Sequence, residues 1–241
     1  MKNKKLKAIL SLSGYLLLLL ALCFTGGLVF HSYYYQSVYI SGISMAPTLN
    51  GQENEKDGSV VDFGIVDNHK SALNNLRRFD IVSTYYPNDY VDGALKNTAN
   101  KKIKRIIALP GESFKITNGL LSIKKDNEFV AIAYPMKIEE TTVKDIEHLE
   151  PLADDEYWVL GDNRTHSSDS KEVGPIKHSQ IVGQLVAIEG RASLKLKKAV
   201  CVNCKATYKE YTKGQGCSKC GGALKPQYDL VNKVYHWPKY F

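Results

Sequence analysis

Hydrophobic positions form two patterns along the 241 residues of the chain. One is a single uncharged run, AILSLSGYLLLLLALCFTGGLVF, over residues 8–30. The other is a series of short segments rich in β-branched and aromatic residues and bounded by turn residues, a pattern typical of β-strands. These predicted strands cover residues 60–66, 80–86, 102–109, 113–116, 120–123, 157–164 and 180–188. The pattern predicts a mainly β body that follows one apolar segment.

The connections between the strands contain recognisable turn residues. Asn118-Gly119 predicts a tight hairpin, because both central positions of such a turn need a positive φ. Pro110-Gly111 predicts another turn. The spacing of apolar residues over 136–150 predicts one short helix, whereas the polar segments 50–58 and 87–100 are expected to form loops.

The run over residues 8–30 is long enough to cross a bilayer. As a helix, its 23 residues would exceed the roughly 30 Å of hydrocarbon in a membrane. A cleaved signal peptide is the alternative, but its apolar core is normally about 7–15 residues and ends at a small-x-small site. Here the run continues through Leu28, Val29 and Phe30, which favours an uncleaved transmembrane anchor. The positive-inside rule then places the Lys-rich residues 1–7 in the cytoplasm and the rest of the chain outside the cell membrane.

Composition and charge exclude several classes of protein. With 44% hydrophobic and 24% charged residues, the chain is neither disordered, nor collagen-like, nor a polytopic membrane protein. The formal charge of +7 fits a nucleic-acid-binding protein, but it is concentrated at the two ends. Residues 1–7 hold four Lys, and residues 195–241 hold ten Lys and two acids, which leaves 18 basic and 23 acidic residues between them. We therefore expect no nucleic-acid partner, and membrane lipid or envelope polymers as partners of the basic tail.

Three polar segments contain residues that can do chemistry. They are Ile-Ser-Gly-Ile-Ser-Met-Ala-Pro-Thr-Leu at 40–49, Lys-Arg-Ile-Ile-Ala-Leu-Pro-Gly-Glu at 104–112 and Gly-Asp-Asn-Arg-Thr-His-Ser-Ser-Asp-Ser-Lys at 161–171. Taken singly, they would be a turn, an amphipathic strand and a polar loop. Common serine-nucleophile motifs do not fit, since Ala46 replaces the second Gly of Gly-x-Ser-x-Gly and Pro47 stands where Ser-x-x-Lys needs its Lys. His166 is the one His in these segments, so a Ser-His-Asp triad is weakly supported.

In this order, after one apolar segment, the three segments resemble bacterial type I signal peptidases, which are membrane-anchored Ser-Lys endopeptidases that remove signal peptides from exported proteins. The motifs Ser-Met-x-Pro-Thr-Leu, Lys-Arg-x-x-x-Leu-Pro-Gly-Glu and Gly-Asp-Asn-Arg-x-x-Ser-x-Asp-Ser carry the resemblance. Residues 78–82, Arg-Phe-Asp-Ile-Val, also resemble the family's Arg-Gly-Asp-Ile-Val, with Phe79 where Gly is usual. The resemblance runs from the anchor to about residue 190 and implies a β-rich peptidase domain over residues 36–194.

The resemblance implies roles for individual residues. Ser44 matches the nucleophile of the family, and Lys104 matches its general base. Because the ordinary pKa of Lys is about 10.4, the base must be made neutral, and burial among apolar neighbours lowers the pKa of an amine. The sequence neighbours of Lys104 are Ile103, Ile106 and Ile107. Ser167 matches a serine that holds the lysine amine, and a supporting polar network matches at Asp162, Arg164 and Asp169.

The resemblance also implies a substrate. This would be an exported preprotein, bound as an extended strand beside the Ser44 segment and cleaved after small residues at −1 and −3, with no cofactor needed for catalysis. Two positions depart from the family. Lys171 stands where Arg is frequent, so its bridge to Asp169 is expected to be weaker. Gly42 stands where some members place a Ser that completes the oxyanion hole, so backbone N–H groups, most simply that of Ser44, are expected to form it.

Four cysteines near the C-terminus form two Cys-x-x-Cys pairs separated by twelve residues: Cys201, Cys204, Cys217 and Cys220. This spacing predicts a zinc-ribbon-like module over residues 195–241, beyond the part that resembles a peptidase. Two disulfides or a redox pair are the alternatives. A staple of some kind is expected, because so short a segment cannot build a sufficient core.

Two other functions compete with signal-peptide cleavage. Another Ser-Lys protease, such as a self-cleaving repressor, would use the same dyad, but no helix-turn-helix region precedes Ser44. A non-enzymatic, membrane-tethered zinc-ribbon binding module would make the Ser44 and Lys104 motifs a coincidence. The sequence favours a membrane serine endopeptidase of the signal peptidase I type.

Overall fold

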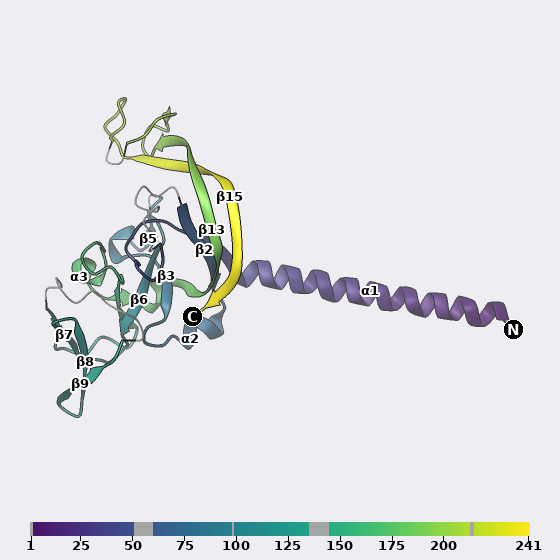
Figure 1. The fold of residues 1–241 in the computed structure, drawn as a ribbon, viewed down its shortest axis with the longest axis horizontal. Helices are drawn as coiled ribbons and strands as arrows, with labels where there is room; N and C mark the ends of the chain where they lie inside the picture. Colours follow the sequence, from purple (N-terminus) through teal and green to yellow (C-terminus); the bar gives the residue numbers. More distant parts are fainter. Residues whose placement is uncertain (1, 51–59, 98, 135–144, 213–214) are drawn as a thin grey trace. The chain divides into compact units, whose positions relative to one another are not determined.

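The computed structural model describes residues 2–50, 60–97, 99–134, 145–212 and 215–241 (Figure 1). The chain divides into two compact units, residues 1–36 and residues 37–241. Most of the regular structure in the second unit is β-strand, which confirms the predicted mainly β body.

The first unit consists mainly of helix α1 (Lys2–Tyr34). Its large apolar side chains from Tyr15 to Val29 are more than half exposed. Among the described residues, no helix has both the length and the apolar character of a membrane span. The predicted transmembrane anchor over residues 8–30 is therefore not supported.

The larger sheet of the second unit has nine strands within the described residues. Along its main path it contains β1 (Tyr35–Ile40), β2 (Val60–Asp67), β13 (Ile181–Cys201), β3 (Ile81–Thr84), β6 (Lys102–Ala108), β11 (Glu156–Leu160) and β12 (Ile176–Lys177). The predicted strands at 60–66, 80–86 and 102–109 are confirmed as β2, β3 and β6. The strand predicted over 157–164 ends at Leu160, so the polar residues after it form a loop.

A smaller sheet contains β10 (Ile146–His148), β7 (Phe114–Thr117), β8 (Leu120–Lys125) and β9 (Glu128–Ile132). The hairpin predicted at Asn118-Gly119 joins β7 to β8, and both turn residues have a positive φ, 49° and 78°. The helix predicted over 136–150 is wrong at residues 146–148, and residues 135–144 lie outside the described residues. Ile146 pairs with Ile116 of β7, and the His148 ring stacks on Phe114, so sheet pairing overrides the helical spacing.

The segments expected to be loops carry little regular structure. Residues 51–58 lie outside the described residues. The 87–100 segment contains a 3-10 turn (Pro87–Asp89) and a two-residue hairpin of β4 (Tyr90–Val91) and β5 (Ala94–Leu95). The other short helices within the described residues are α2 (Lys70–Asn74), α3 (Ser170–Val173) and a 3-10 turn at His178–Gln180.

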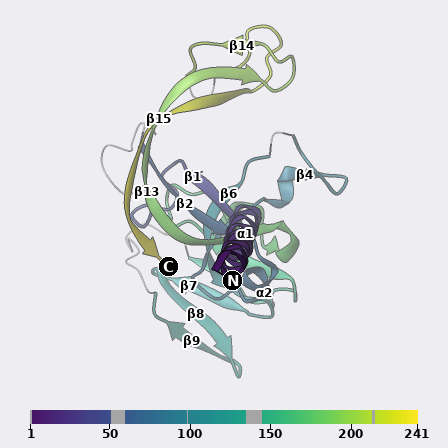
Figure 2. The same ribbon diagram turned by 90° about the vertical axis from the view of Figure 1, so that its right-hand side faces the viewer.

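β13 extends well beyond the strand predicted at 180–188 and pairs with β15 (Leu224–Tyr240), which the sequence pattern did not predict. The two strands run side by side as a long ribbon, from Ala187 opposite Tyr240 to Cys201 opposite Leu224 (Figures 1 and 2). β14 (Thr207–Tyr208) adds to the cysteine end of the ribbon. The cysteine module is therefore connected to the main sheet by two continuous strands.

A buried cluster lies beneath the turn that follows β1. Its members are Ile40, Met45, Leu49, Val66, Ile81 and Leu185. Met45 and Leu49 come from the turn itself, and each is 1% exposed. These two apolar anchors hold the turn against the main sheet, and Ser44 immediately precedes the first of them.

Candidate active site

Ser44 and Lys104 are in direct contact. Ser44 lies in the turn after β1, and Lys104 lies in β6. Nζ of Lys104 lies 2.8 Å from Oγ of Ser44 and donates to the carbonyl oxygen of Ile103 at 3.0 Å. Lys104 is only 4% exposed. The fold thus places an amine and a hydroxyl, far apart in sequence, at hydrogen-bond distance in a largely dry site.

Burial lowers the pKa of Lys104 to about 8, because the charged ammonium loses hydrating water. The carboxylates of Asp169 and Asp162 oppose this shift, whereas the like charges of Lys171 and Lys102 add to it. Burial is the largest effect. A useful fraction of the Lys104 amine is therefore neutral near neutral pH, as a general base requires.

The turn that carries Ser44 is held by backbone hydrogen bonds. The Ala46 N–H donates to the Ile43 carbonyl at 3.0 Å, and the Leu49 N–H donates to the Met45 carbonyl at 2.8 Å. The Ser44 carbonyl accepts a hydrogen bond of 3.0 Å from the N–H of Asn163. This last bond attaches the turn that carries Ser44 to the polar loop after β11.

The two segments also lie close together at Gly161, the residue after β11. A Cβ at this position would lie 2.2 Å from Oγ of Ser167 and 2.4 Å from the carbonyl oxygen of Ser44. Both values are far below van der Waals contact. Glycine is therefore required here so that the polar loop can lie against the turn that carries Ser44.

The two buried carboxylates of the polar loop are each paired with a different cation. Asp162 accepts hydrogen bonds from Nε and Nη2 of Arg105 at 2.9 and 2.7 Å. Both oxygens of Asp169 lie 2.8 Å from Nζ of Lys171. The Asp169 side chain is fully buried. The bridge from Lys171 to Asp169 was expected to be weaker because Lys lacks the planar guanidinium of Arg. In the structure, the Lys171 ammonium nevertheless contacts both carboxylate oxygens of Asp169.

Asp169 also organises the polar loop. One of its oxygens accepts from the N–H of Gly161 at 2.9 Å, and the other accepts from the N–H of Lys171 at 3.2 Å, where Asp169 caps helix α3. The carboxylate therefore ties the beginning of the loop to its end.

Ser167 and Arg164 are buried, but their side chains have no hydrogen-bond partner among the described residues. The implied contact between Ser167 and the Lys104 amine is therefore not formed in this structure. The Arg164 guanidinium lies over the ring of Tyr134, 5.5 Å from its centroid. Their supporting roles stay predictions.

His166 is exposed and interacts within its own loop. Its Nδ1 lies 2.8 Å from the Thr165 hydroxyl and 3.4 Å from Oδ1 of Asn163. Lys104, and not an imidazole, contacts the Ser44 hydroxyl.

Three contributors to the site were not assigned roles from the sequence: Arg105, Gly161 and Asn163. A signal for Arg105 was present, because it lies within a largely apolar strand next to Lys104 and a buried cation needs a partner. The role of Asn163 is a backbone contact, and side-chain chemistry gives no signal for such contacts.

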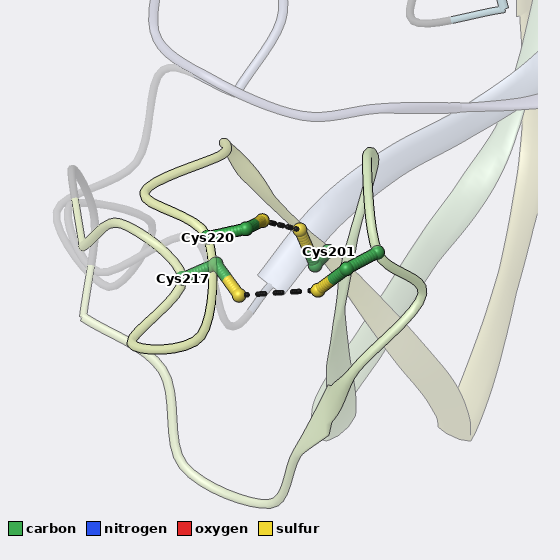
Figure 3. Close-up of side chains that lie close together, drawn as sticks. Cys201, Cys217 and Cys220 are labelled. Atoms are coloured by element: carbon green, nitrogen blue, oxygen red, sulfur yellow. Dashed lines mark hydrogen bonds between the residues drawn. The ribbon is translucent and has the colours of Figure 1, made fainter.

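The four predicted cysteines of the tail converge on one point. Their sulfur atoms all lie within 4.8 Å of one another. Cys201 lies 3.5 Å from Cys220, and Cys204 lies 3.5 Å from Cys217, measured between sulfurs (Figure 3). A tetrahedron of thiolates around zinc at about 2.3 Å has edges of about 3.8 Å, whereas a disulfide bond is about 2.05 Å long. The separations match a metal site better than two disulfides.

The two Cys-x-x-Cys turns repeat the same backbone hydrogen bonds. The N–H of Lys205 donates to the Cys201 carbonyl at 3.1 Å, and the N–H of Gly221 donates to the Cys217 carbonyl at 2.8 Å. Lys205 and Gly221 occupy equivalent positions and both have a positive φ, 62° and 69°. The Tyr208 hydroxyl lies 3.1 Å from the Cys217 sulfur. The module thus presents its thiols from two equivalent turns.

Residues 11–188 match the family described as signal peptidase, peptidase S26. The chain is 32% identical over 188 residues to signal peptidase I U of Bacillus subtilis, covering 76% of this chain and 87% of that protein. It is 32% identical over 160 residues to signal peptidase IB of Staphylococcus aureus, covering 61% of this chain and 73% of that protein. A crystal structure of a signal peptidase I from Enterococcus faecalis aligns with 46% of this chain and 97% of that chain, at 25% identity and a TM-score of 0.36.

Proposed function

Because the chain belongs to the peptidase S26 family of signal peptidases, we propose that it is a serine endopeptidase that cleaves signal peptides from exported preproteins, with Ser44 as nucleophile and Lys104 as general base. The observation that carries the assignment of the two residues is the 2.8 Å contact between the Ser44 hydroxyl and the buried Lys104 amine. A serine hydroxyl is a weak nucleophile until a neighbouring base takes its proton.

The contact supports a simple sequence of proton transfers. Neutral Lys104 accepts the proton of Ser44 as Oγ attacks the scissile carbonyl carbon, and the C=O π electrons move to the oxygen. The resulting ammonium then gives the proton to the leaving amine as the C–N bond breaks. Water hydrolyses the acyl-enzyme by the same route, with Lys104 again as base. The Ser44 N–H has no acceptor among the described residues and is the simplest donor to the oxyanion.

Substitution of the two residues tests the dyad. We expect Ser44→Ala and Lys104→Met each to reduce kcat on a preprotein with an Ala-x-Ala site by about 10³-fold or more. Ser179→Ala and Lys124→Met are matched controls, because both residues are exposed and neither contacts the dyad. Normal cleavage by either dyad variant would reject the assignment.

For the substrate, we propose an extended segment that lies beside the Ser44 turn and presents small residues at −1 and −3. The support is the family membership together with the partial exposure of Ser44 and the exposure of the residues before it. Peptides with Ala at both positions should be cleaved faster than the same peptides with Leu at −1. Equal rates would reject this specificity.

We propose that residues 36–194 form the catalytic domain. We also propose that α1 lies in membrane lipid, because its exposed leucines between residues 16 and 22 would be costly to leave in water. Phase separation in a nonionic detergent tests the lipid contact, with Leu18→Asp as the disrupting variant. Recovery of the unaltered chain in the aqueous phase would contradict it.

The thiol cluster of the tail supports a structural zinc site formed by Cys201, Cys204, Cys217 and Cys220. Zinc would hold together a module with few buried apolar residues and would take no part in peptide hydrolysis. Purified protein should contain one zinc ion per chain, and Cys204→Ser should lose it. Cys23→Ser is the matched control, because Cys23 lies in α1. Absence of zinc together with absence of free thiols in the module would establish disulfides instead.

A further inference from the structure

The loop that carries Ser44 is closed by the side chain of Asn50. The loop leaves the sheet after Ile40, and the Asn50 amide nitrogen donates both to the Ile40 carbonyl and, at 3.0 Å, to the Gly42 carbonyl. One side chain at the far end of the loop thus holds two carbonyls at its beginning.

The same residue is bound to β2 by a reciprocal pair of hydrogen bonds. Oδ1 of Asn50 accepts from the N–H of Asp62 at 2.7 Å, and the N–H of Asn50 donates to Oδ2 of Asp62 at 2.8 Å. Asp62 in turn lies 3.5 Å from Nε of Arg191 in β13. The loop is therefore fastened through Asn50 to two strands of the main sheet.

Asparagine is well suited to this position. Asn50 is 4% exposed, and its φ of 53° lies in the left-handed region, which Gly and Asn tolerate best. Glycine would accept the backbone conformation but has no amide. Aspartate would keep the acceptor for the Asp62 N–H but could not donate to the two carbonyls.

The other contacts of the loop act further along it. Met45 and Leu49 are packed in the core, and the Ser44 carbonyl is bound by Asn163. Among the described residues, Asn50 is the side chain that hydrogen-bonds the carbonyls of Ile40 and Gly42, just before the proposed nucleophile. Gly42, with a φ of 90°, has wide conformational freedom, so this part of the loop needs an external restraint.

We propose that Asn50 is a positioning residue that sets the place of the Ser44 hydroxyl relative to the Lys104 amine without touching the substrate. The inference rests on the proposed roles of Ser44 and Lys104. A loss of Asn50 displaces an intact nucleophile from an intact base. Its effect should therefore fall on kcat and leave KM nearly unchanged.

The first test is the kinetics of Asn50→Gly, which keeps the left-handed backbone accessible and removes the amide. We expect kcat to fall by about 10²-fold, the loss typical of a displacement near 1 Å, with KM within about twofold. Asn118→Gly is the matched control, because Asn118 has a similar φ of 49° but lies in an exposed hairpin turn. Asn50→Asp retains the size of the side chain and one acceptor, and it should also lower kcat. This variant replaces Asn50→Gly in the test if Asn50→Gly does not fold.

The second test does not depend on peptide cleavage. In Ser44→Cys protein, a nearby Lys104 ammonium should lower the thiol pKa below its ordinary 8.5, as measured by the pH dependence of alkylation with iodoacetamide. Adding Asn50→Gly should return the thiol pKa towards 8.5, whereas adding Asn118→Gly should not. Unchanged kcat and an unchanged thiol pKa in folded Asn50 variants would overturn the proposal. A thiol in Ser44→Cys that is already ordinary would instead reject the Ser44–Lys104 pairing.

Discussion

The contact at Gly161 predicts a large effect from one added methyl group. In Gly161→Ala, the new Cβ would lie 2.2 Å from Oγ of Ser167 and 2.4 Å from the Ser44 carbonyl oxygen. The Ser167 side chain can rotate away, but the Ser44 oxygen belongs to the backbone. The nucleophile turn and the polar loop must therefore separate by about 1 Å before the methyl group is accommodated.

A displacement of this size determines the expected loss. Moving a reacting group by about 1 Å costs about 10²-fold in rate, and forcing a methyl group into a packed site costs about 1–3 kcal/mol of stability. We therefore expect kcat of Gly161→Ala to fall by about 10²-fold in protein that still folds at 25 °C. The separation also lengthens the hydrogen bond from the Asn163 N–H to the Ser44 carbonyl.

Initial rates on a preprotein and thermal unfolding of the same samples would measure both effects. Gly216→Ala is a suitable control, because a Cβ there would meet its nearest neighbour at 3.5 Å, an ordinary contact. If Gly161→Ala cleaves within threefold of the unaltered enzyme, the close approach does not position Ser44 and the reasoning fails.

Three further predictions concern charge and backbone conformation. Because the pKa of Lys104 is lowered to about 8, kcat/KM should rise about tenfold per pH unit below pH 8 and level off above it. A kcat/KM that does not change between pH 6 and 9 would exclude Lys104 as the base. Lys171→Met leaves the buried Asp169 carboxylate unpaired, and its negative charge then favours the protonated form of Lys104. The rise of kcat/KM with pH should therefore occur at higher pH in Lys171→Met, whereas Lys171→Arg should leave it unchanged. Lys205→Gly relieves a φ of 62° and should stabilise the cysteine module by about 0.5–1 kcal/mol, seen as slower loss of metal to a chelator; faster loss would contradict the assigned strain.

The strands of the β body were predictable from the sequence because they are short runs rich in β-branched and aromatic residues and are separated by specific turn residues. Asn118-Gly119 is the clearest case, since its positive φ values are those that the hairpin requires. β15 was missed because its sequence, LKPQYDLVNKVYHWPKY, contains two Pro and no regular alternation. It becomes a strand by pairing with β13, a tertiary effect that no local pattern contains.

The sequence indicated those residues of the candidate site whose side chains belong to the three motifs. The pairing of Ser44 with Lys104 was implied by the resemblance of their motifs to those of signal peptidases, although sixty residues separate them. The bridge between Lys171 and Asp169 was expected as well, but the pairing of Asp162 with Arg105 did not follow from the motifs. Nor did Asn50, because its role depends on an amide that meets two carbonyls brought together by the fold.

The pairing of the buried carboxylates explains how a lysine can be a base in this site. A buried amine beside Asp162 and Asp169 would ordinarily form an ion pair and stay protonated, because each carboxylate stabilises the ammonium. Here Asp162 is bound by Arg105 and Asp169 by Lys171, so both negative charges are balanced by other cations. Lys104 is left with two uncharged oxygens, the Ser44 hydroxyl and the Ile103 carbonyl. Burial then dominates its pKa, and the neutral amine that serine attack requires becomes accessible near neutral pH.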